Sequence, residues 1–254
     1  MRYSYATHLA CSSTGQPHEL SKLHGLSSAN KPLLARYDLE ALKHRVSRAE
    51  IASRAATLWR WHELLPVPDA SYIVSLGEEQ TPLIPLLNSR QPRGYAAPLV
   101  KDEGRLPTGS FKARGLCLAV SMAKFHRVRR VAIPTNGNAG AALAAYAARA
   151  GMEAFCFCPS DTPEINVREI AAQGAAVWRV NGLINDCAKL SPEGAATYAA
   201  YLQAAASDRI KPSDKVVLFN CATGLKYAMP DHAETMDVGA PLDAEAVRRK
   251  LRAH

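Results

Sequence analysis

The chain has 254 residues, of which 48% are hydrophobic, so it can bury a substantial core as one large domain or as two small ones. Its formal net charge is +8, but the basic residues are scattered and no cluster is interleaved with aromatic side chains, which argues against nucleic-acid binding and favours an anionic small molecule as partner. No run approaches the ~20 apolar residues that span a bilayer, and the first residues lack the apolar core of a signal peptide, so we expect a cytoplasmic protein without a membrane partner.

The cysteines show neither a disulfide framework nor a metal-ligand spacing, which predicts a reducing compartment and no metal site. Cys156 and Cys158 lie in an apolar, strand-like run, where alternate residues point the same way and a buried thiol packs as a small hydrophobic group. The six cysteines are Cys11, Cys117, Cys156, Cys158, Cys187 and Cys221.

The first third of the chain gives weak structural signals. Residues 1–36 are polar and rich in turn formers. Residues 37–56 carry apolar side chains at helical spacing, which predicts one helix. The aromatic side chains within residues 58–61 are expected to pack between segments. Residues 73–76 are short and apolar, and they predict a strand.

From about residue 97 onward, strands and helices alternate. We expect strands at 97–101, 130–134, 153–158, 176–180 and 215–219. Helices are expected from near 110, over 141–150 with Gly151 as its stop, over 163–173 with Gly174 as its stop, over 191–206 and over 244–251. This alternation predicts parallel βαβ units, whose ligands bind at the carboxyl ends of the strands.

One lysine stands where such a site would lie. The segment from Lys101 to Gly115 runs from a strand through a Pro/Gly/Ser turn into a helix, and it places Lys112 in the first helical turn. Unpaired N–H groups and the positive end of the helix dipole disfavour a second positive charge there. We therefore expect this lysine to lose its proton more easily than usual, as imine chemistry with a carbonyl cofactor requires.

Two further turns complete the set of groups that pyridoxal 5'-phosphate needs. The cofactor requires an amine, a hydrogen-bond donor at its ring hydroxyl and a partner at its pyridine nitrogen. Thr135-Asn-Gly-Asn138 follows one predicted strand, and Asn220-Cys-Ala-Thr-Gly224 follows another. An asparagine amide suits the ring hydroxyl, and a hydroxyl or thiol suits the ring nitrogen.

The order of several motifs along almost the whole chain resembles the threonine synthases, which belong to the tryptophan-synthase-β-like class (fold type II) of pyridoxal-phosphate enzymes. The motifs that carry this resemblance are Leu34-Ala-Arg-Tyr-Asp-Leu-Glu40, Val74-Ser-Leu-Gly-Glu78, Pro107-Thr-Gly-Ser-Phe-Lys-Ala-Arg-Gly115, Gly137-Asn-Ala-Gly140, Asp161-Thr-Pro163, Pro192-Glu-Gly-Ala-Ala196 and Val216-Val-Leu-Phe-Asn220. The resemblance implies a three-layer α/β fold, and it divides the chain into residues 1–98, a cofactor-binding region at 99–190 and a C-terminal part at 191–254.

The resemblance also assigns roles to residues. It makes Lys112 the Schiff-base lysine and proton carrier, and it places Asn138 at the cofactor's ring hydroxyl with Gly137 beside it. Cys221 stands where the family has a threonine at the pyridine nitrogen, and Thr223 follows it in the same turn. The anionic amino-acid substrate is assigned to Ser110, Thr135, Asn136 and Ala139.

The sequence departs from the family at one junction. Leu190 runs directly into Ser191, where the family has a further stretch on the order of 100 residues, and no Gly-Gly-Gly run occurs in the chain. The Gly-rich loop that holds the cofactor phosphate is therefore missing from the pattern. Threonine synthase activity in threonine biosynthesis, a related fold type II activity such as cysteate synthase or serine/threonine dehydratase, and an inactive, internally deleted homologue all stay open, as does a homodimer.

Overall fold

The computed structural model of the chain describes residues 2–85, 99–181 and 216–218. The predicted helices at 191–206 and 244–251 lie outside these residues, as do the turn at 220–224 and the junction at Leu190.

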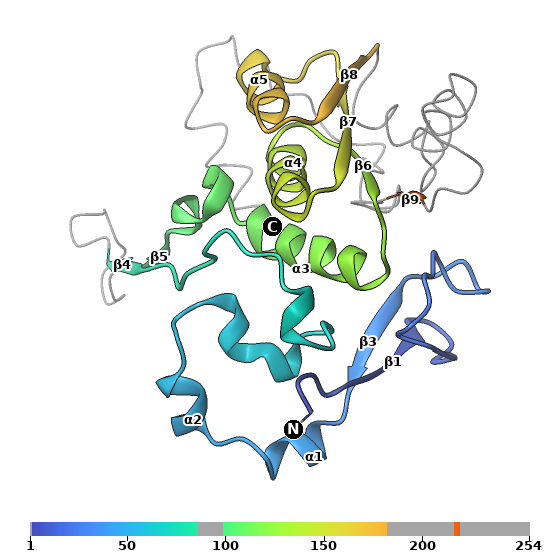
Figure 1. The fold of residues 1–254 in the computed structure, drawn as a ribbon, viewed down its shortest axis with the longest axis vertical. Helices are drawn as coiled ribbons and strands as arrows, with labels where there is room; N and C mark the ends of the chain where they lie inside the picture. The colour runs from blue at the N-terminus through green and yellow to red at the C-terminus, as the bar shows by residue number, and fades with distance from the viewer. Residues whose placement is uncertain (1, 86–98, 182–215, 219–254) are drawn as a thin grey trace, which may run out of the picture.

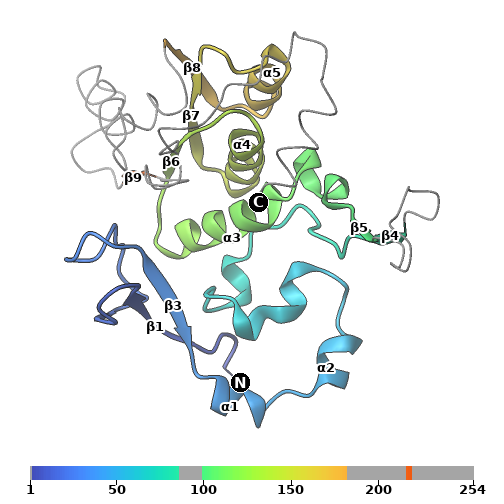
Figure 2. The same ribbon diagram turned by 180° about the vertical axis from the view of Figure 1, so that it is seen from behind.

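The described residues near the N-terminus form a small antiparallel sheet that the sequence analysis did not predict. Strands β1 (Ala6–Cys11), β2 (Pro17–His18) and β3 (Leu33–Tyr37) pair in the order β2-β1-β3. Ala10 and Cys11 of the central strand are buried, at 3% and 1% exposure. Figures 1 and 2 show this sheet at the opposite end of the molecule from β8 and α5.

The single helix predicted over residues 37–56 is wrong. The structure has two short helices, α1 (Leu39–Lys43) and α2 (Arg48–Ser53). Each begins at a side-chain cap: the Asp38 carboxylate accepts from Ala41 N–H at 2.9 Å, and the Ser47 hydroxyl accepts from Glu50 N–H at 3.1 Å. Because a serine cap satisfies the free N–H groups of a new helix, Ser47 starts a second helix and does not continue the first.

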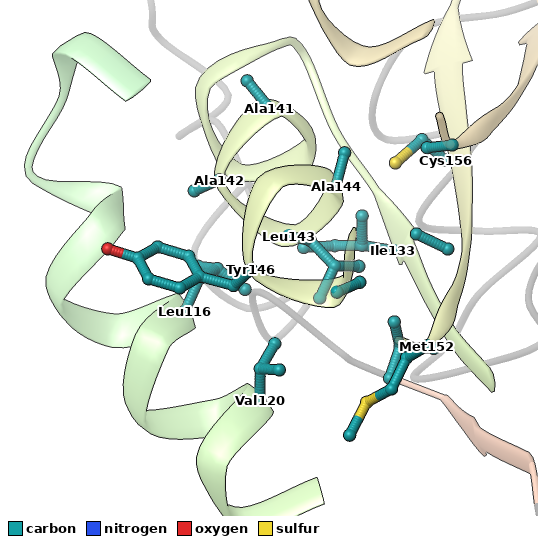
Figure 3. Close-up of a cluster of buried hydrophobic side chains, with 14 of the residues drawn as sticks. Leu116, Val120, Ile133, Ala141, Ala142, Leu143, Ala144, Tyr146, Met152 and Cys156 are labelled. Atoms are coloured by element: carbon teal, nitrogen blue, oxygen red, sulfur yellow. The ribbon is translucent and has the colours of Figure 1, made fainter. Parts of the chain in front are cut away.

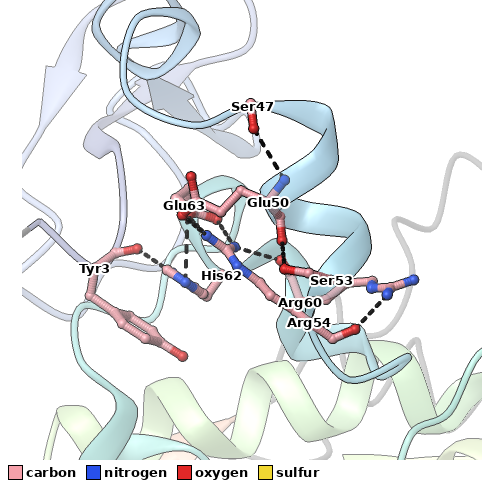
Figure 4. A network of polar contacts seen from close by, with 8 residues as sticks. All are labelled: Tyr3, Ser47, Glu50, Ser53, Arg54, Arg60, His62 and Glu63. Carbon is pink, nitrogen blue, oxygen red and sulfur yellow. Dashed lines mark hydrogen bonds and ion pairs between the residues drawn. The ribbon is translucent and has the colours of Figure 1, made fainter.

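A network of polar contacts joins α2 and the N-terminal residues to the 3₁₀ segment η1 (Leu58–Leu64), as Figure 4 shows. The Arg54 guanidinium donates to both carboxylate oxygens of Glu63, at 2.6 and 2.8 Å, and the Glu63 side chain is only 8% exposed. His62 Nδ1 lies 2.7 Å from the backbone oxygen of Tyr3, and their rings stack. The end of α2 is therefore joined to η1 by paired charges, and the N-terminal segment by a backbone contact and a ring stack.

The strand predicted at residues 73–76, which follow η2 (Ala70–Tyr72), is also wrong. The backbone there bonds to side chains instead of to a neighbouring strand. Val74 N–H donates to the buried Ser121 hydroxyl at 2.9 Å, and Leu76 N–H donates to the Glu78 carboxylate at 2.7 Å. The apolar side chain of Val74 is buried in the core, but its segment packs on α3 without joining a sheet.

The middle of the chain forms a hairpin and then the first long helix. Strands β4 (Leu83–Pro85) and β5 (Leu99–Lys101) pair in an antiparallel manner. Two 3₁₀ turns follow, η3 (Glu103–Arg105) and η4 (Pro107–Gly109), and helix α3 extends over Lys112–Phe125.

A parallel sheet with helices on one side forms the rest, and it matches the predicted alternation closely. Strands β6 (Arg130–Pro134), β7 (Glu153–Pro159), β8 (Ala176–Val180) and β9 (Val216–Leu218) lie in the order β8-β7-β6-β9, and each neighbouring pair is parallel. Helices α4 (Asn138–Ala150) and α5 (Glu164–Ala172) connect successive strands on the same side of the sheet (Figures 1 and 2).

Helix α4 is the centre of the core, between the sheet and α3. Its residues from Gly140 to Ala147 are all buried, and most are alanine, so neighbouring elements can approach its backbone closely on every side. Figure 3 shows Leu143 and Ala144 near Ile133 of β6, while Tyr146 extends toward α3. Cys156 and Cys158 are both fully buried, which confirms their prediction as core residues.

Within the described residues, none of the helices combines the length and apolar character needed to cross a membrane. The same residues include no group of three or more potential metal ligands.

Candidate functional site

Lys112 is the first residue of α3, as the sequence predicts. Two consecutive residues before it have left-handed backbone angles, Thr108 with φ +65° and Gly109 with φ +62°. Glycine adopts such angles freely, whereas threonine does so at a cost of about 1–3 kcal/mol. A non-glycine residue held in this conformation marks a turn that the surrounding structure fixes.

The Lys112 amine makes a cation–π contact with Phe111 but no hydrogen bond or ion pair among the described residues. Its Nζ lies 4.8 Å from the centroid of the Phe111 ring. Phe111 itself is 59% exposed. The hydroxyls of Thr108 and Ser110 are buried close by in the chain, also without a hydrogen-bond partner among the described residues. Buried hydroxyls without partners are rare, because each costs about 1–3 kcal/mol, so this segment is well suited to contact a polar ligand.

An ion pair holds the start of α3 against the preceding segment. The Arg114 guanidinium donates to both oxygens of Glu103, at 2.6 and 2.9 Å, and the Thr81 hydroxyl also donates to this carboxylate. The hydrogen bonds from Arg114 lower the pKa of Glu103 to about 2. Lys101 Nζ donates to the Thr81 carbonyl at 2.6 Å. Charged hydrogen bonds of Lys101 and Arg114 therefore fix the segment on both sides of Lys112.

Beneath this segment lies a buried carboxylate that the sequence analysis did not single out. Glu78 has no exposed surface, and it accepts hydrogen bonds from Tyr146 Oη at 2.5 Å and from Ser75 Oγ at 2.7 Å. Burial acts to raise the pKa of Glu78, but its hydrogen bonds outweigh burial and the pKa is lowered. Burial, together with Glu78, raises the pKa of Tyr146. Glu78 lies in one of the motifs that resemble the family. That motif gave no sign that the Glu78 carboxylate accepts four hydrogen bonds.

The second predicted turn lies at the carboxyl end of β6 and leads into α4. The Thr135 hydroxyl is buried and accepts from Gly137 N–H at 3.0 Å and from Gly140 N–H at 2.9 Å. The two backbone amides between these, those of Asn138 and Ala139, have no acceptor among the described residues. They stand at the positive end of a 13-residue helix, where an anion is stabilised.

The turn before Lys112 and the turn at residues 135–138 both lie against helix α4. Turn η4, which precedes Lys112, packs against α4, the helix that begins at Asn138. Asn136 and Asn138 are exposed, whereas Ser110, Thr135 and Gly137 are buried and Ala139 is half-buried. The two remaining predicted residues, Cys221 and Thr223, lie outside the described residues.

Comparison with known proteins identifies the family. Residues 74–191 match the family described as "Pyridoxal-phosphate dependent enzyme", and this match ends beside the Leu190/Ser191 junction. Threonine synthase from Methanocaldococcus jannaschii is 31% identical over 222 residues, covering 87% of this chain and 55% of that protein. Threonine synthase from Halalkalibacterium halodurans is 40% identical over 126 residues, covering 49% of this chain and 35% of that protein.

Among solved structures, the apo form of Escherichia coli diaminopropionate ammonia lyase has 23% identity and a TM-score of 0.43, over 56% of this chain and 39% of that chain. The chain thus spans about half the length, or less, of the proteins it matches.

The match over residues 74–191 and the similarity to curated relatives confirm the predicted family and the α/β fold class. Within that family its similarity is to the threonine synthases. Pyridoxal 5'-phosphate is the family's cofactor, so this prediction is also confirmed. The described residues fit this cofactor. Turn η4, which packs on α4, carries a buried Thr108 hydroxyl without a hydrogen-bond partner among the described residues, and it precedes the equally unpartnered Ser110 hydroxyl and the Lys112 amine.

Proposed function

We propose that the chain is a threonine synthase-type lyase, which converts O-phospho-L-homoserine and water into L-threonine and phosphate. The observation that carries the proposal is the Lys112 amine at the start of α3, which has no hydrogen bond or ion pair among the described residues and lies two residues after the buried Ser110 hydroxyl. The similarity of 87% of the chain to a threonine synthase supports this choice of reaction.

Lys112 would bind the cofactor covalently and carry protons between the Cα, Cβ and Cγ atoms of the substrate. Lys112 is the first residue of α3, so its side chain begins where the backbone N–H groups have no acceptor within the helix. Pyridoxal 5'-phosphate, when bound, supplies the electron sink that stabilises a carbanion. The Asn138 amide would donate to the cofactor's ring hydroxyl from the first residue of α4, with Gly137 beside it. Cys221 is proposed for the pyridine nitrogen, and Thr223 for the cofactor site, on sequence grounds alone.

The substrate carboxylate would lie at the start of α4. The free amides of Asn138 and Ala139 would donate to it, together with the exposed Asn136 side chain. Thr135 would support the site without touching the substrate, because its buried hydroxyl accepts two backbone hydrogen bonds and so holds the shape of the turn. The buried Ser110 hydroxyl remains available on the opposite segment.

A second candidate is a homologue without catalytic activity. The observation that favours it is the lack of any Gly-Gly-Gly run in the 254 residues, since such a run supplies the backbone amides for the cofactor phosphate. Within the enzyme class, cysteate synthase and serine/threonine dehydratase remain alternatives, because the residues around the cofactor would be the same. A cytoplasmic location, which the sequence led us to expect, and a homodimer are also part of the proposal.

Absorbance spectroscopy tests the proposal. We expect the purified chain with added pyridoxal phosphate to develop the band of lysine-bound cofactor, and Lys112→Ala to lack it. Lys124→Ala is the matched control: Lys124 lies on the same helix, is exposed, and its one hydrogen bond among the described residues is to the Ser71 carbonyl, at 2.8 Å. Release of phosphate from O-phospho-L-homoserine then tests the reaction. A band without turnover would contradict the synthase assignment, and no band would favour the inactive homologue.

A further inference from the structure

Asn166, in the first turn of α5, contacts the turn before α4 from the next βαβ unit. Its Nδ2 donates to the backbone carbonyl of Asn136 at 3.1 Å. The two helices also pack against each other. Asn166 has no assigned role, and the contact joins residues 30 positions apart.

The peptide unit between Asn136 and Gly137 is held at both of its polar ends. Its carbonyl oxygen accepts from Asn166, and its N–H donates to the Thr135 hydroxyl at 3.0 Å. A rotation of this peptide would break both hydrogen bonds, so the contact with Asn166 fixes the plane of the peptide. The orientation of this peptide sets the direction of the amides that follow it at the start of α4.

Gly137 makes room for the Asn166 side chain. The glycine has φ +137°, in a region that side-chain-bearing residues rarely adopt. A Cβ atom there would lie 2.3 Å from Asn166 Nδ2 and 2.6 Å from Cγ. The glycine of this turn therefore allows the asparagine amide to lie directly on the peptide that it bonds.

We propose that Asn166 is a positioning residue for the substrate carboxylate. By holding the Asn136–Gly137 peptide, it aims the free amides of Asn138 and Ala139 at one point, where a carboxylate would accept both. Asn166 itself does not touch the substrate. This inference rests on the proposed function, because it is the substrate of the proposed reaction that carries the carboxylate.

Three variants separate the hydrogen bond from simple packing. Asn166→Asp keeps the size of the side chain but removes the donor, and it places a carboxylate near the Asn136 carbonyl. An acidic residue in the first turn of a helix is otherwise favourable, which offsets part of the lost hydrogen bond, and a thermal melt of Asn166→Asp measures what remains. Asn166→Ala removes both the donor and the packing. Ile165→Ala is the control, because that neighbouring side chain is 72% exposed.

Hydrogen exchange on the cofactor-free chain gives the first readout. We expect Asn166→Asp to accelerate exchange of the Gly137 and Gly140 amides on the order of tenfold, as loss of one hydrogen bond allows, with Ile165→Ala unchanged. Unchanged exchange in Asn166→Asp would show that Asn166 does not hold the turn, and would overturn the proposal.

The affinity of the cofactor-loaded chain for O-phospho-L-homoserine gives the second readout. We expect Asn166→Asp to take up cofactor like the unmodified chain but to bind this compound on the order of tenfold more weakly. Equal affinity would overturn the positioning role. A chain whose Lys112 forms no cofactor band refutes the proposed function and the substrate role of Asn166 together, whereas equal affinity in a loaded chain refutes the role of Asn166 alone.

Discussion

Replacing Glu78 by glutamine should destabilise the protein far more than this nearly isosteric change would elsewhere. The Glu78 carboxylate is fully buried and accepts four hydrogen bonds. One oxygen accepts from Tyr146 Oη and from Leu76 N–H, and the other from Ser75 Oγ and from Trp59 Nε1. Each oxygen therefore has one donor that cannot rotate, a backbone amide at 2.7 Å or an indole N–H at 3.1 Å.

A glutamine amide cannot satisfy both of these fixed donors. Whichever way it is turned, its NH₂ group faces either Leu76 N–H or Trp59 Nε1–H, and that donor loses its acceptor. A buried donor without a partner costs about 1–3 kcal/mol, and loss of the charge weakens the remaining bonds as well. We therefore expect Glu78→Gln to lower the free energy of unfolding by about 3 kcal/mol. For a chain of this size, that corresponds to a fall in Tm of roughly 6–12 °C.

Urea denaturation followed by circular dichroism, together with a thermal melt, measures this change. The neighbouring Glu79→Gln is the control, because Glu79 is exposed and its side chain has no hydrogen bond to a described residue. A Glu78→Gln variant as stable as Glu79→Gln would refute the reasoning, since it would mean that the four donors do not depend on a carboxylate.

Two other predictions concern ion pairs. Arg54→Ala leaves the buried Glu63 carboxylate without its bidentate partner, so we expect a loss of about 3 kcal/mol in urea denaturation, whereas Lys22→Ala, which breaks a pair in solvent, should change nothing measurable. The Arg114 hydrogen bonds lower the pKa of Glu103 from 4.5 to about 2. Since the lowered pKa stabilises the fold only while Glu103 is charged, this contribution is complete above pH 4.5 and is lost as pH falls toward 2, and Glu103→Gln should flatten the loss of stability in that window. If the stability of Glu103→Gln and of the unmodified protein changed equally with pH, this prediction would be contradicted.

The parallel sheet and its helices could be predicted from the sequence because several signals agreed. β6 and β8 have the predicted bounds, and α4 ends at Gly151, which has the expected left-handed conformation. Strand-like apolar runs, helical spacing and glycine stops all indicated the same boundaries. Where only one signal was present, the prediction failed. Helical spacing over residues 37–56 predicted one helix and gave no sign that a second begins after the Ser47 cap.

The position of Lys112 could also be predicted, because a turn before an apolar helix can be recognised from local sequence. The contacts that Asn166 and Tyr146 make around the site could not be predicted from the sequence. Asn166 bonds to a carbonyl 30 residues away, and Tyr146 bonds to a carboxylate 68 residues away. Such pairs exist only once α4 and α5 have packed, so spacing along the chain gives no sign of them. The antiparallel sheet near the N-terminus was missed because its strands are short and many of their residues are exposed.

Strand β6 has one partner from nearby sequence and one from far along the chain. Arg130 pairs with Glu153 of β7 after a single helix, and with Val216 of β9 much later. The second pairing closes a loop roughly two doublings longer, which adds an entropic cost of about 1.2 kcal/mol. Refolding should therefore be sequential, with β6 and β7 associating early and the β9 edge docking last. During synthesis, this edge of β6 stays unpaired until the later residues have been made, and an unpaired strand edge can pair with another nascent chain.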